Sequence, residues 1–402
     1  MIVRLRQNNP SKKKTVLYVS QKSIGRILKS FIIASVILLF FVDILFALLP
    51  DRRRDFEQRE ENVYMALPII ASIPGAGVFG GMLGSFSNIA GTGIDAAIVE
   101  ASTFNSEADI HIRAWAFKEL PLYVPGLTLE YWFGDINFSD YQSYLPGRDS
   151  PKFTIPSTGK IKYNFLRPAL RLFKRRFNMT YNLVFFKGFA VNGSGEEEEI
   201  AQHSASGNIL LDFTDDVIDP KIGLRLSYTN SMKAPESSFL GKNSSNESGF
   251  LDDIETRQKE IIAYIPFTDQ FTLVAFNQIF EAIGGENSGD VISGGSLSLR
   301  GYPGGRWSDR YGETRSLEGR YTVPTNLDLD IYIVHGLLEG IQFAAFYETG
   351  QVAPDKDNRL YEDLHRSYGV GVRLLLEAIV LRADIADSDE GIQTHITIDQ
   401  PF

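Results

Sequence analysis

The sequence predicts an all-β protein, namely a transmembrane antiparallel β-barrel of about 16 strands that follows an N-terminal signal or anchor helix. Three observations lead to this fold class: period-2 alternation of apolar and polar residues, many glycine and aromatic residues, and turns that alternate between short and long. Gly 35, Phe 28 and Tyr 17 are high counts for a chain of 402 residues. Aromatic girdles at the two membrane interfaces of a barrel account for the aromatic excess.

The N-terminal segment has the pattern of an export signal or a membrane anchor. Basic residues, including Lys12, Lys13 and Lys14, precede an apolar run from Phe31 to Leu49 whose only charge is Asp43. A basic segment before an apolar run is typical of a signal peptide, and a run of this length can also just span a bilayer. We therefore expect a signal peptide or signal anchor over 1–50, a short linker over 51–62 and the barrel over 63–402.

Alternating segments of about ten residues, divided by turn residues, then continue to the C-terminus. One apolar stripe runs from Phe177 through Tyr181 to Phe185, and another runs from Tyr368 to Leu376. In the last segment Ile392, Ile396 and Phe402 are expected to share one face. The glycine-rich segment 75–84 is interpreted as part of the first strand. The sixteen predicted strands cover about 76–88, 93–104, 108–119, 127–138, 159–167, 176–189, 204–213, 221–231, 257–266, 270–282, 289–297, 313–323, 340–350, 366–376, 378–387 and 391–402.

The connections between these segments alternate in length. Short turns occur near 268–270 and 388–390, and long polar loops are expected over 139–158, 190–203 and 232–256. Outer-membrane barrels have short turns at one end and long, external loops at the other. A soluble β-sandwich would show the same alternation, but so many apolar stripes in one domain are unusual for it.

Charge and motif content exclude several function classes. After residue 54 the chain is strongly acidic, which argues against nucleic-acid binding because phosphate contacts need a basic surface. The chain has no cysteine, and its five histidines lack metal-ligand spacing, so no metal site, cofactor or catalytic residue is predicted. An enzyme acting on lipid would need a histidine on the outer wall of the barrel. We expect both His111 and His395 to face inward, which disfavours such an enzyme.

Four passages in the C-terminal half resemble the bacterial surface antigen superfamily of outer-membrane barrels, which includes BamA, TamA and the two-partner secretion translocators. The match is good over 205–402 and loose over 63–204. The passages are an acidic hairpin motif (Asp215, Asp219, Pro220, Gly223), a loop motif from Gly294 to Tyr302 (with Leu299, Arg300 and Gly301), a strand from Phe343 to Val352, and closing strands that end at Phe402.

The resemblance implies that the loop carrying Arg300 folds into the lumen and binds carboxylates there. Alternation independently places Glu318, Glu348 and Asp384 on the inward face, because the apolar residues beside each of them face lipid. Arginine suits this role, since it is always charged and offers a planar fork to a carboxylate.

The chain also departs from the family pattern. Glu348 stands where members carry an aspartate, and Arg320 stands where many carry a glutamate. No segment corresponds to the periplasmic POTRA modules that receive clients in the family. The resemblance therefore does not imply how a client would be delivered to this chain.

The expected role is protein assembly or translocation at the bacterial outer membrane. The alternatives are a passive pore or structural barrel and an enzyme that acts on outer-membrane lipid. Expected partners are outer-membrane lipid, the barrel-insertion machinery, for which Phe402 is a candidate C-terminal signal, and a separate periplasmic receptor or client protein.

Overall fold

The computed structural model describes most of the chain beyond residue 62. The described residues are 63–73, 77–104, 109–144, 147–151, 154–173, 175–191, 197–235, 254–283, 291–295, 299–331, 334–356, 361–376, 379–398 and 400–402. The predicted signal or anchor over 1–50 and the linker over 51–62 lie outside them. Among the described residues, no helix has the length and apolar character needed to cross a membrane.

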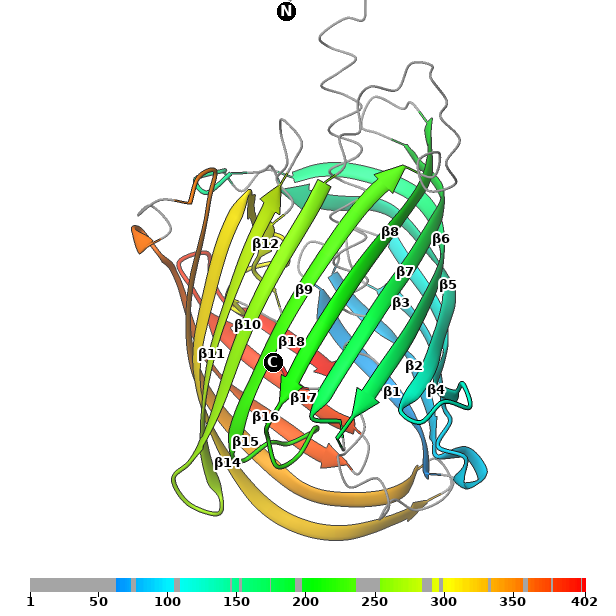
Figure 1. Cartoon of the computed structure of the whole chain (residues 1–402). Coiled ribbons are helices and arrows are strands. Elements are labelled where there is room, and N and C mark those ends of the chain that lie inside the picture. The colour runs from blue at the N-terminus through cyan, green and yellow to red at the C-terminus, as the bar shows by residue number, and fades with distance from the viewer. Residues whose placement is uncertain are drawn as a thin grey trace, which may run out of the picture.

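Sixteen strands form one antiparallel sheet that curls into a barrel (Figure 1). Each strand pairs with its neighbour in sequence, except that β11 pairs with β14. β12 and β13 form a separate two-stranded sheet in the connection between these two strands. The strands are β1 Val63–Ile73, β2 Gly77–Ser87, β3 Asp95–Phe104, β4 Asp109–Pro121, β5 Leu127–Tyr144, β6 Thr154–Leu172, β7 Phe177–Val191, β8 Glu197–Asp212, β9 Gly223–Pro235, β10 Ile254–Pro266, β11 Phe271–Ile283, β12 Val291–Ser293, β13 Trp307–Asp309, β14 Tyr311–Ile331, β15 Val334–Ala353, β16 His365–Leu376, β17 Ile379–Asp387 and β18 Gln393–Ile398.

The predicted fold class and strand number agree with this sheet, but one predicted strand was wrong and one strand of the barrel was not predicted. The segment 289–297 was predicted as a barrel strand, whereas only β12 forms there and it pairs outside the barrel. Strand β1 was missed because Pro68 interrupts its pattern. Proline is tolerated in a strand at the edge of a sheet, and β1 is such a strand because it begins the sheet order.

The two ends of the barrel differ in loop length, but two of the predicted long loops, 139–158 and 190–203, are partly strand, because β5 extends to Tyr144 and β8 begins at Glu197. The predicted short turn at 388–390 also lies at the end that has the longer connections, rather than at the opposite end. The connections 122–126, 173–176, 213–222 and 267–270 lie at one end, which we name the turn end and which is at the bottom of Figure 1. The strand ends that flank the longer connections 236–253, 284–310 and 354–364 lie at the opposite end, which we name the loop end.

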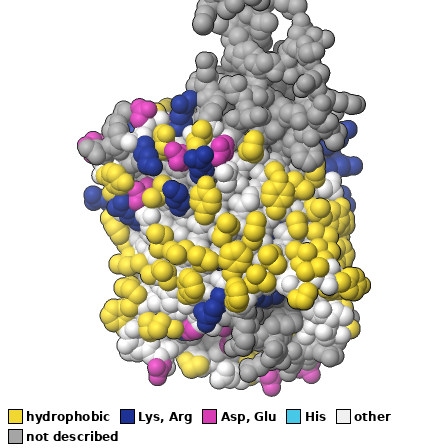
Figure 2. All heavy atoms as spheres, viewed as in Figure 1, with side chains coloured by type: hydrophobic (Ala, Val, Ile, Leu, Met, Phe, Trp, Pro, Cys, Tyr) yellow, Lys and Arg dark blue, Asp and Glu magenta, His cyan; other side chains and the backbone are white. Residues whose placement is uncertain are grey.

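The outer surface carries an apolar belt. Large exposed side chains such as Met179, Tyr181, Leu317, Phe343 and Val370 alternate with buried or half-buried residues along their strands. On the face seen in Figure 2 hydrophobic side chains form a continuous band, and charged side chains gather above it toward the loop end. An outward apolar band flanked by polar residues is what a lipid environment requires of a barrel.

A long hairpin helps to close the barrel at the turn end. Beyond a register shift at Pro324–Leu327, β14 and β15 continue as a pair to Ile331 and Val334. In Figure 1 this extension curves beneath the other strands and reaches β1. There Tyr64 pairs with His335, and Met65 pairs with Val334.

The seam of the barrel lies between the first and last strands. β1 and β18 are neighbours in space, yet no ladder pairing joins them among the described residues. β18 is also short, with 6 residues against the 11 residues of β1. Because β18 does not pair with β1 within the described part of the chain, part of the edge of β1 pairs with the extension of β15 instead.

Candidate functional site

The candidate site is built around the loop between β11 and β14, whose described part we name the lumenal loop (residues 291–295 and 299–310). Its two ends are tied together by the β12–β13 pairing and by the hydrogen bond from the Gly295 N–H to the Tyr302 carbonyl. Arg300 and Tyr302 are almost fully buried, although they lie on a loop. The loop therefore folds into the barrel, where it meets the inner faces of β14 to β18.

Arg300 contacts three carboxylates on three strands. Its Nε lies 2.8 Å from Glu348 Oε1 on β15, and its Nη1 lies 2.8 Å from Asp384 Oδ2 on β17. Its Nη2 lies 2.9 Å from Glu318 Oε2 on β14, as an ion pair whose angle is outside hydrogen-bonding geometry. The Arg300 backbone N–H also donates to Glu348 Oε2 at 2.6 Å. One side chain thus joins the loop to three separate strands.

Three further arginines complete what we name the lumenal ion cluster. The cluster consists of Arg300, Glu318, Arg320, Glu348, Arg373, Arg382 and Asp384, all at most 1% exposed. Arg320 and Arg373 donate to Glu318 Oε1 at 2.7 and 2.9 Å, while Arg382 lies 3.5 Å from Asp384. Four guanidinium groups face three carboxylates, so the cluster carries one net positive charge.

Other groups hold Arg300 and fix its charge. Its guanidinium carbon lies 3.3 Å from the ring centroid of Phe346, in a cation–π contact. His395 on β18 lies with its Nε2 2.7 Å from the Arg300 carbonyl. Burial lowers the pKa of Arg300, but the carboxylates, Glu348 foremost, raise it by more, so the net pKa is above the ordinary arginine value. Arg300 therefore stays charged.

Two glycines allow the loop and the strands to approach closely. A Cβ on Gly301 would lie 2.7 Å from the Asp387 carbonyl oxygen and from the Ser367 Cβ. A Cβ on Gly371 would lie 1.9 Å from Asp384 Oδ1, which is nearer than any side chain could come. These positions explain why glycine follows Arg300 and why glycine alternates with apolar residues in β16.

A second group of contacts fixes the loop nearer the loop end. The Tyr302 hydroxyl donates to Asp389, and burial followed by this hydrogen bond raises the pKa of Tyr302, so the phenol stays protonated. Arg306 lies 2.8 Å from Glu390 and stacks on Trp307. The turn between β17 and β18, which holds both acids, is thereby connected to the loop.

The structure brings together all the predicted partners of Arg300, since Glu318, Glu348 and Asp384 all contact it. It also adds Arg373, which sequence reasoning did not single out as part of the site. The apolar stripe Tyr368–Leu376 placed Arg373 inward by alternation, but only the curvature of the sheet brings it to Glu318. What the cluster does for function remains a prediction.

The acidic hairpin motif forms the turn between β8 and β9. Asp215 accepts hydrogen bonds from the Lys221 and Ile222 N–H groups at 2.9 and 3.1 Å. Asp219, which precedes Pro220, accepts a hydrogen bond from Gln342 on β15 at 3.0 Å. A simple Asp-Pro turn would not need this contact with a distant strand. Gly223 has φ 129°, a conformation that favours glycine. The turn therefore reaches across the turn end to the opposite wall of the barrel.

The position of Phe402 differs from the expectation that it shares an outward face with Ile392 and Ile396. Those two isoleucines are exposed, but Phe402 lies inside the barrel. Its ring stacks on Phe276 of β11 with 4.5 Å between centroids. The chain leaves the sheet after β18, and Pro401 precedes Phe402, so the alternation of β18 no longer sets the side of the final residue. Its role as an insertion signal remains a prediction.

The prediction that His111 faces inward was wrong, whereas His395 does face inward. The flanking residues Ile110 and Ile112 are buried in the lumen, so His111 is on the outer wall. There Ser102 Oγ lies 2.7 Å from His111 Nδ1, and Glu100 lies 3.7 Å from His111 Nε2. The error arose because the apolar face of this strand turns to the lumen rather than to lipid.

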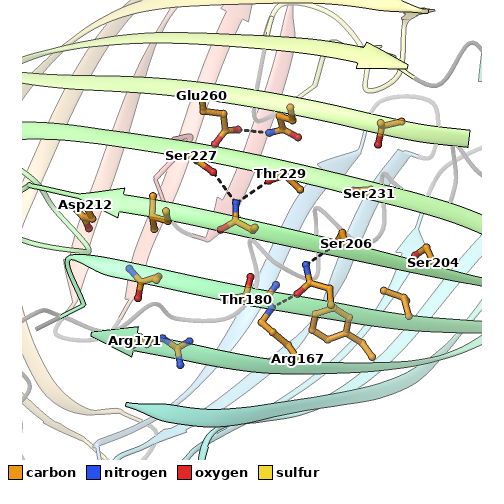
Figure 3. A pocket seen from close by; sticks show the side chains of 18 of the residues that line it. Arg167, Arg171, Thr180, Ser204, Ser206, Asp212, Ser227, Thr229, Ser231 and Glu260 are labelled. Atoms are coloured by element: carbon orange, nitrogen blue, oxygen red, sulfur yellow. Dashed lines mark hydrogen bonds between the residues drawn. The ribbon is translucent and has the colours of Figure 1, made fainter. Parts of the chain in front are cut away.

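A cavity of about 580 Å³ lies along the inner wall formed by β6 to β10. Neutral hydrogen-bonding side chains make up half of its lining, and Figure 3 shows several of them linked by hydrogen bonds across the strands. Arg167 donates to Asn182, which donates to Ser206, each at 2.8 Å. Asn208 donates to Ser227 and Thr229. This wall offers hydroxyl and amide groups, and no group of metal-binding residues occurs among the described residues.

Comparisons with known proteins place the fold. No protein-family model and no curated protein sequence matches the chain. Among solved structures, CdiB from Escherichia coli matches with TM-score 0.56 and 13% identity over 85% of this chain and 63% of CdiB. CdiB from Acinetobacter baumannii matches with TM-score 0.53 and 12% identity over 85% of this chain and 60% of that one.

A third solved structure, BamA from Haemophilus ducreyi lacking POTRA domains 1–3, has TM-score 0.49 and 11% identity, covering 85% of this chain and 70% of that one. The chain spans less than two thirds of both CdiB chains. At these identities the likeness concerns the fold, and the chain has the fold of an outer-membrane β-barrel.

Proposed function

We propose that this barrel acts at the bacterial outer membrane in the assembly or translocation of protein, as members of the superfamily that includes BamA do. The observation that carries the proposal is the lumenal ion cluster. It holds a long loop inside the barrel through Arg300 and carboxylates on β14, β15 and β17. The four sequence passages that resemble the superfamily include this loop and two of these strands.

Removing the seven charged groups of the lumenal ion cluster from water costs free energy, which supports a role for the cluster beyond stability. A buried ion pair repays the loss of hydration only when its geometry is good, and apolar packing could fill the same space at lower cost. The loop and the seam are also connected, because β17 and β18 contribute Asp384 and His395 to the surroundings of Arg300. A change in the loop can therefore reach the last strand, which has no ladder to β1 among the described residues.

The experiment is gene loss followed by quantitative surface labelling of outer-membrane proteins. We expect the surface level of one or more proteins to fall and to recover with the wild-type gene. Arg300→Ala should fail to restore it even when the barrel is folded. If no protein changes its surface level, the assembly or translocation proposal is wrong.

A passive pore or structural barrel is the first alternative, and the surface level of outer-membrane proteins after gene loss separates it from the proposal. The cavity along β6 to β10 gives this alternative a physical basis. In planar bilayers, removal of the lumenal loop should raise single-channel conductance for either function. Higher conductance without any loss of a surface protein in the gene-loss strain would favour the pore.

A lipid-acting enzyme is the second alternative, and the outward position of His111 favours it. Ser102 and His111 have the separation of a nucleophile and its base. In the usual catalytic triad the Nε2 of the histidine faces the serine and its Nδ1 faces the acid. Here Nδ1 faces Ser102 and Nε2 faces Glu100. Hydrolysis of a phospholipid by purified protein, abolished by Ser102→Ala and by His111→Ala, would support the enzyme. Equal turnover by wild type and both variants would eliminate it.

A further inference from the structure

We infer that the outer wall of β6 and β7 binds the phosphate groups of a phosphorylated glycolipid of the lipid A type through a cluster of three lysines. This lysine cluster consists of Lys160, Lys162 and Lys187. The inference rests on the proposed outer-membrane location but not on protein assembly or translocation.

The lysines lie together because of the register of the strands. Lys162 of β6 is directly opposite Lys187 of β7, and Lys160 is two residues from Lys162 on the same face. Directly opposed residues of an antiparallel pair have Cβ atoms roughly 5 Å apart, and like charges there destabilise the sheet. An anion between them would remove this cost.

No acidic residue of the described chain compensates the cluster. None of the three lysines makes an ion pair or a side-chain hydrogen bond with any part of the chain that the structure describes. Asp135, which is opposite Lys162, lies 3.3 Å from Arg113 on its other side. On β8, the residue directly opposite Lys187 is Ala201, and Glu199 is opposite Phe189, so no acidic residue is paired with Lys187 across these two strands. Two other basic residues of the outer wall differ from these lysines, because Arg257 and Arg315 each form an ion pair with a glutamate two residues away.

The cluster stands at the level where a lipid headgroup would lie. On β4 and β5, Trp115, Phe133 and Tyr131 stack in sequence, with centroids 5.3 and 5.4 Å apart. The Tyr131 hydroxyl donates to Asn164, two residues from Lys162 toward the turn end. Aromatic residues mark the membrane interface of a barrel. The lysines lie between these aromatic residues and the exposed Phe189, which is opposite Lys160 and two residues beyond Lys187 toward the loop end. They are therefore at the level of the interface and face the headgroups of the outer leaflet.

Lipid A suits this surface better than a phospholipid. It carries two phosphates on one rigid disaccharide, so a single molecule can satisfy two separate lysines. Attraction of a lysine to an anionic surface is substantial, and three such residues act together. Lipid A is also the characteristic lipid of the outer leaflet, which the loop end faces in an outer-membrane barrel.

The test measures lipid binding to the purified full chain in detergent micelles by native mass spectrometry. The probes are diphosphoryl lipid A, dephosphorylated lipid A and phosphatidylglycerol. We expect wild type to bind diphosphoryl lipid A and to bind both other lipids weakly. The variant Lys160→Gln/Lys162→Gln/Lys187→Gln should bind diphosphoryl lipid A at least about tenfold more weakly.

A matched pair of double variants controls for net charge. Lys162→Gln/Lys187→Gln and Arg257→Gln/Arg315→Gln each remove two positive charges from the outer wall, but only the first should weaken binding. Heat-modified mobility on gels reports whether each variant is folded. Equal binding by wild type and the triple variant would overturn the site. Binding of phosphatidylglycerol as tight as that of diphosphoryl lipid A would overturn the assignment to lipid A.

Discussion

At the scale of single residues, Arg300 and its carboxylates form one coupled unit. Each group in the cluster is buried and depends on at least one partner of opposite charge. Removal of one partner therefore leaves a charge without compensation, and the cost of this exceeds what the intact pair contributes. Effects of substitutions inside the cluster should not add.

We predict that Arg300→Ala and Glu348→Ala are strongly non-additive. Each single change should lower the free energy of unfolding by about 3–5 kcal/mol where the cluster is dry, since Arg300→Ala leaves Glu348 without its arginine and Glu348→Ala raises the net positive charge of the buried cluster from one to two. The double variant should lose much less than the sum of the two single losses. With both side chains removed, neither remains as a buried charge that has lost the other. Urea unfolding in lipid vesicles gives the three values. Additive losses would show that the two groups do not interact.

We also predict that Gly371→Ala separates the geometry of the cluster from its charge. The new methyl group would meet Asp384 Oδ1, which lies 1.9 Å from the ideal Cβ position. Asp384 must then move away from Arg300, so the variant should lose stability of the same order as Asp384→Ala. Gly207→Ala on β8 is the control, because nothing lies within 4 Å of its ideal Cβ. A neutral effect of Gly371→Ala on urea unfolding would contradict the described contact.

At the scale of elements, closure of the barrel depends on the extension of β14 and β15 as well as on the end strands. β1 pairs with β2 along its full length but with β15 at only two positions, Tyr64 and Met65. The extension therefore bridges the seam at the turn end. Toward the loop end, β18 lies beside β1 without a ladder in the described residues.

This pairing predicts a disulfide in the variant Tyr64→Cys/His335→Cys. Paired residues of antiparallel strands have Cα atoms about 4.5–5.5 Å apart, which is within the range a disulfide spans. The natural chain has no cysteine, so no other bond can form. Oxidation should give a crosslink in the folded barrel, seen as changed mobility on a gel without reductant. Tyr64→Cys/Phe343→Cys should give none, and a crosslink of equal yield there would refute the register.

The C-terminal tail gives a prediction that separates folding from insertion. Phe402→Ala and Phe276→Ala both remove the stack inside the barrel. The free energy of unfolding should fall by about 2 kcal/mol for the partly buried Phe402 and by about 3 kcal/mol for the buried Phe276. Only Phe402→Ala changes the C-terminal residue. If Phe402 is an insertion signal, only this variant should assemble slowly into the outer membrane in cells. Equal assembly defects in the two variants would reject the signal.

At the scale of the whole molecule, the lumen has unlike walls. Inward residues of β3 to β6 are largely apolar, such as Val99, Ile112 and Ile161. The wall from β7 to β9 is mostly neutral and polar and lines the cavity, and the wall from β14 to β17 carries the ion cluster. The loop is fixed to the charged wall, so open space remains on the neutral polar side (Figure 3).

The sequence by itself determined the fold class, the strand number and the direction of most side chains. Alternation with period 2 is a local property, so Leu317, Phe343 and Ala383 were sufficient to place Glu318, Glu348 and Asp384 inside. This reasoning failed for His111, because its strand has an apolar face toward the lumen and hydropathy alone does not distinguish the two faces. It failed for β1 as well, where Pro68 masks the pattern of an edge strand.

Only the tertiary structure decided which inward residues meet. Arg300, Glu318 and Asp384 are brought together by the closure of the sheet and the inward path of a loop, and neither is encoded in local periodicity. The same closure brings Phe402 onto Phe276 and carries the β14–β15 extension to β1. Local alternation fixes the side of a residue, whereas contact across a barrel depends on curvature and register summed over many strands.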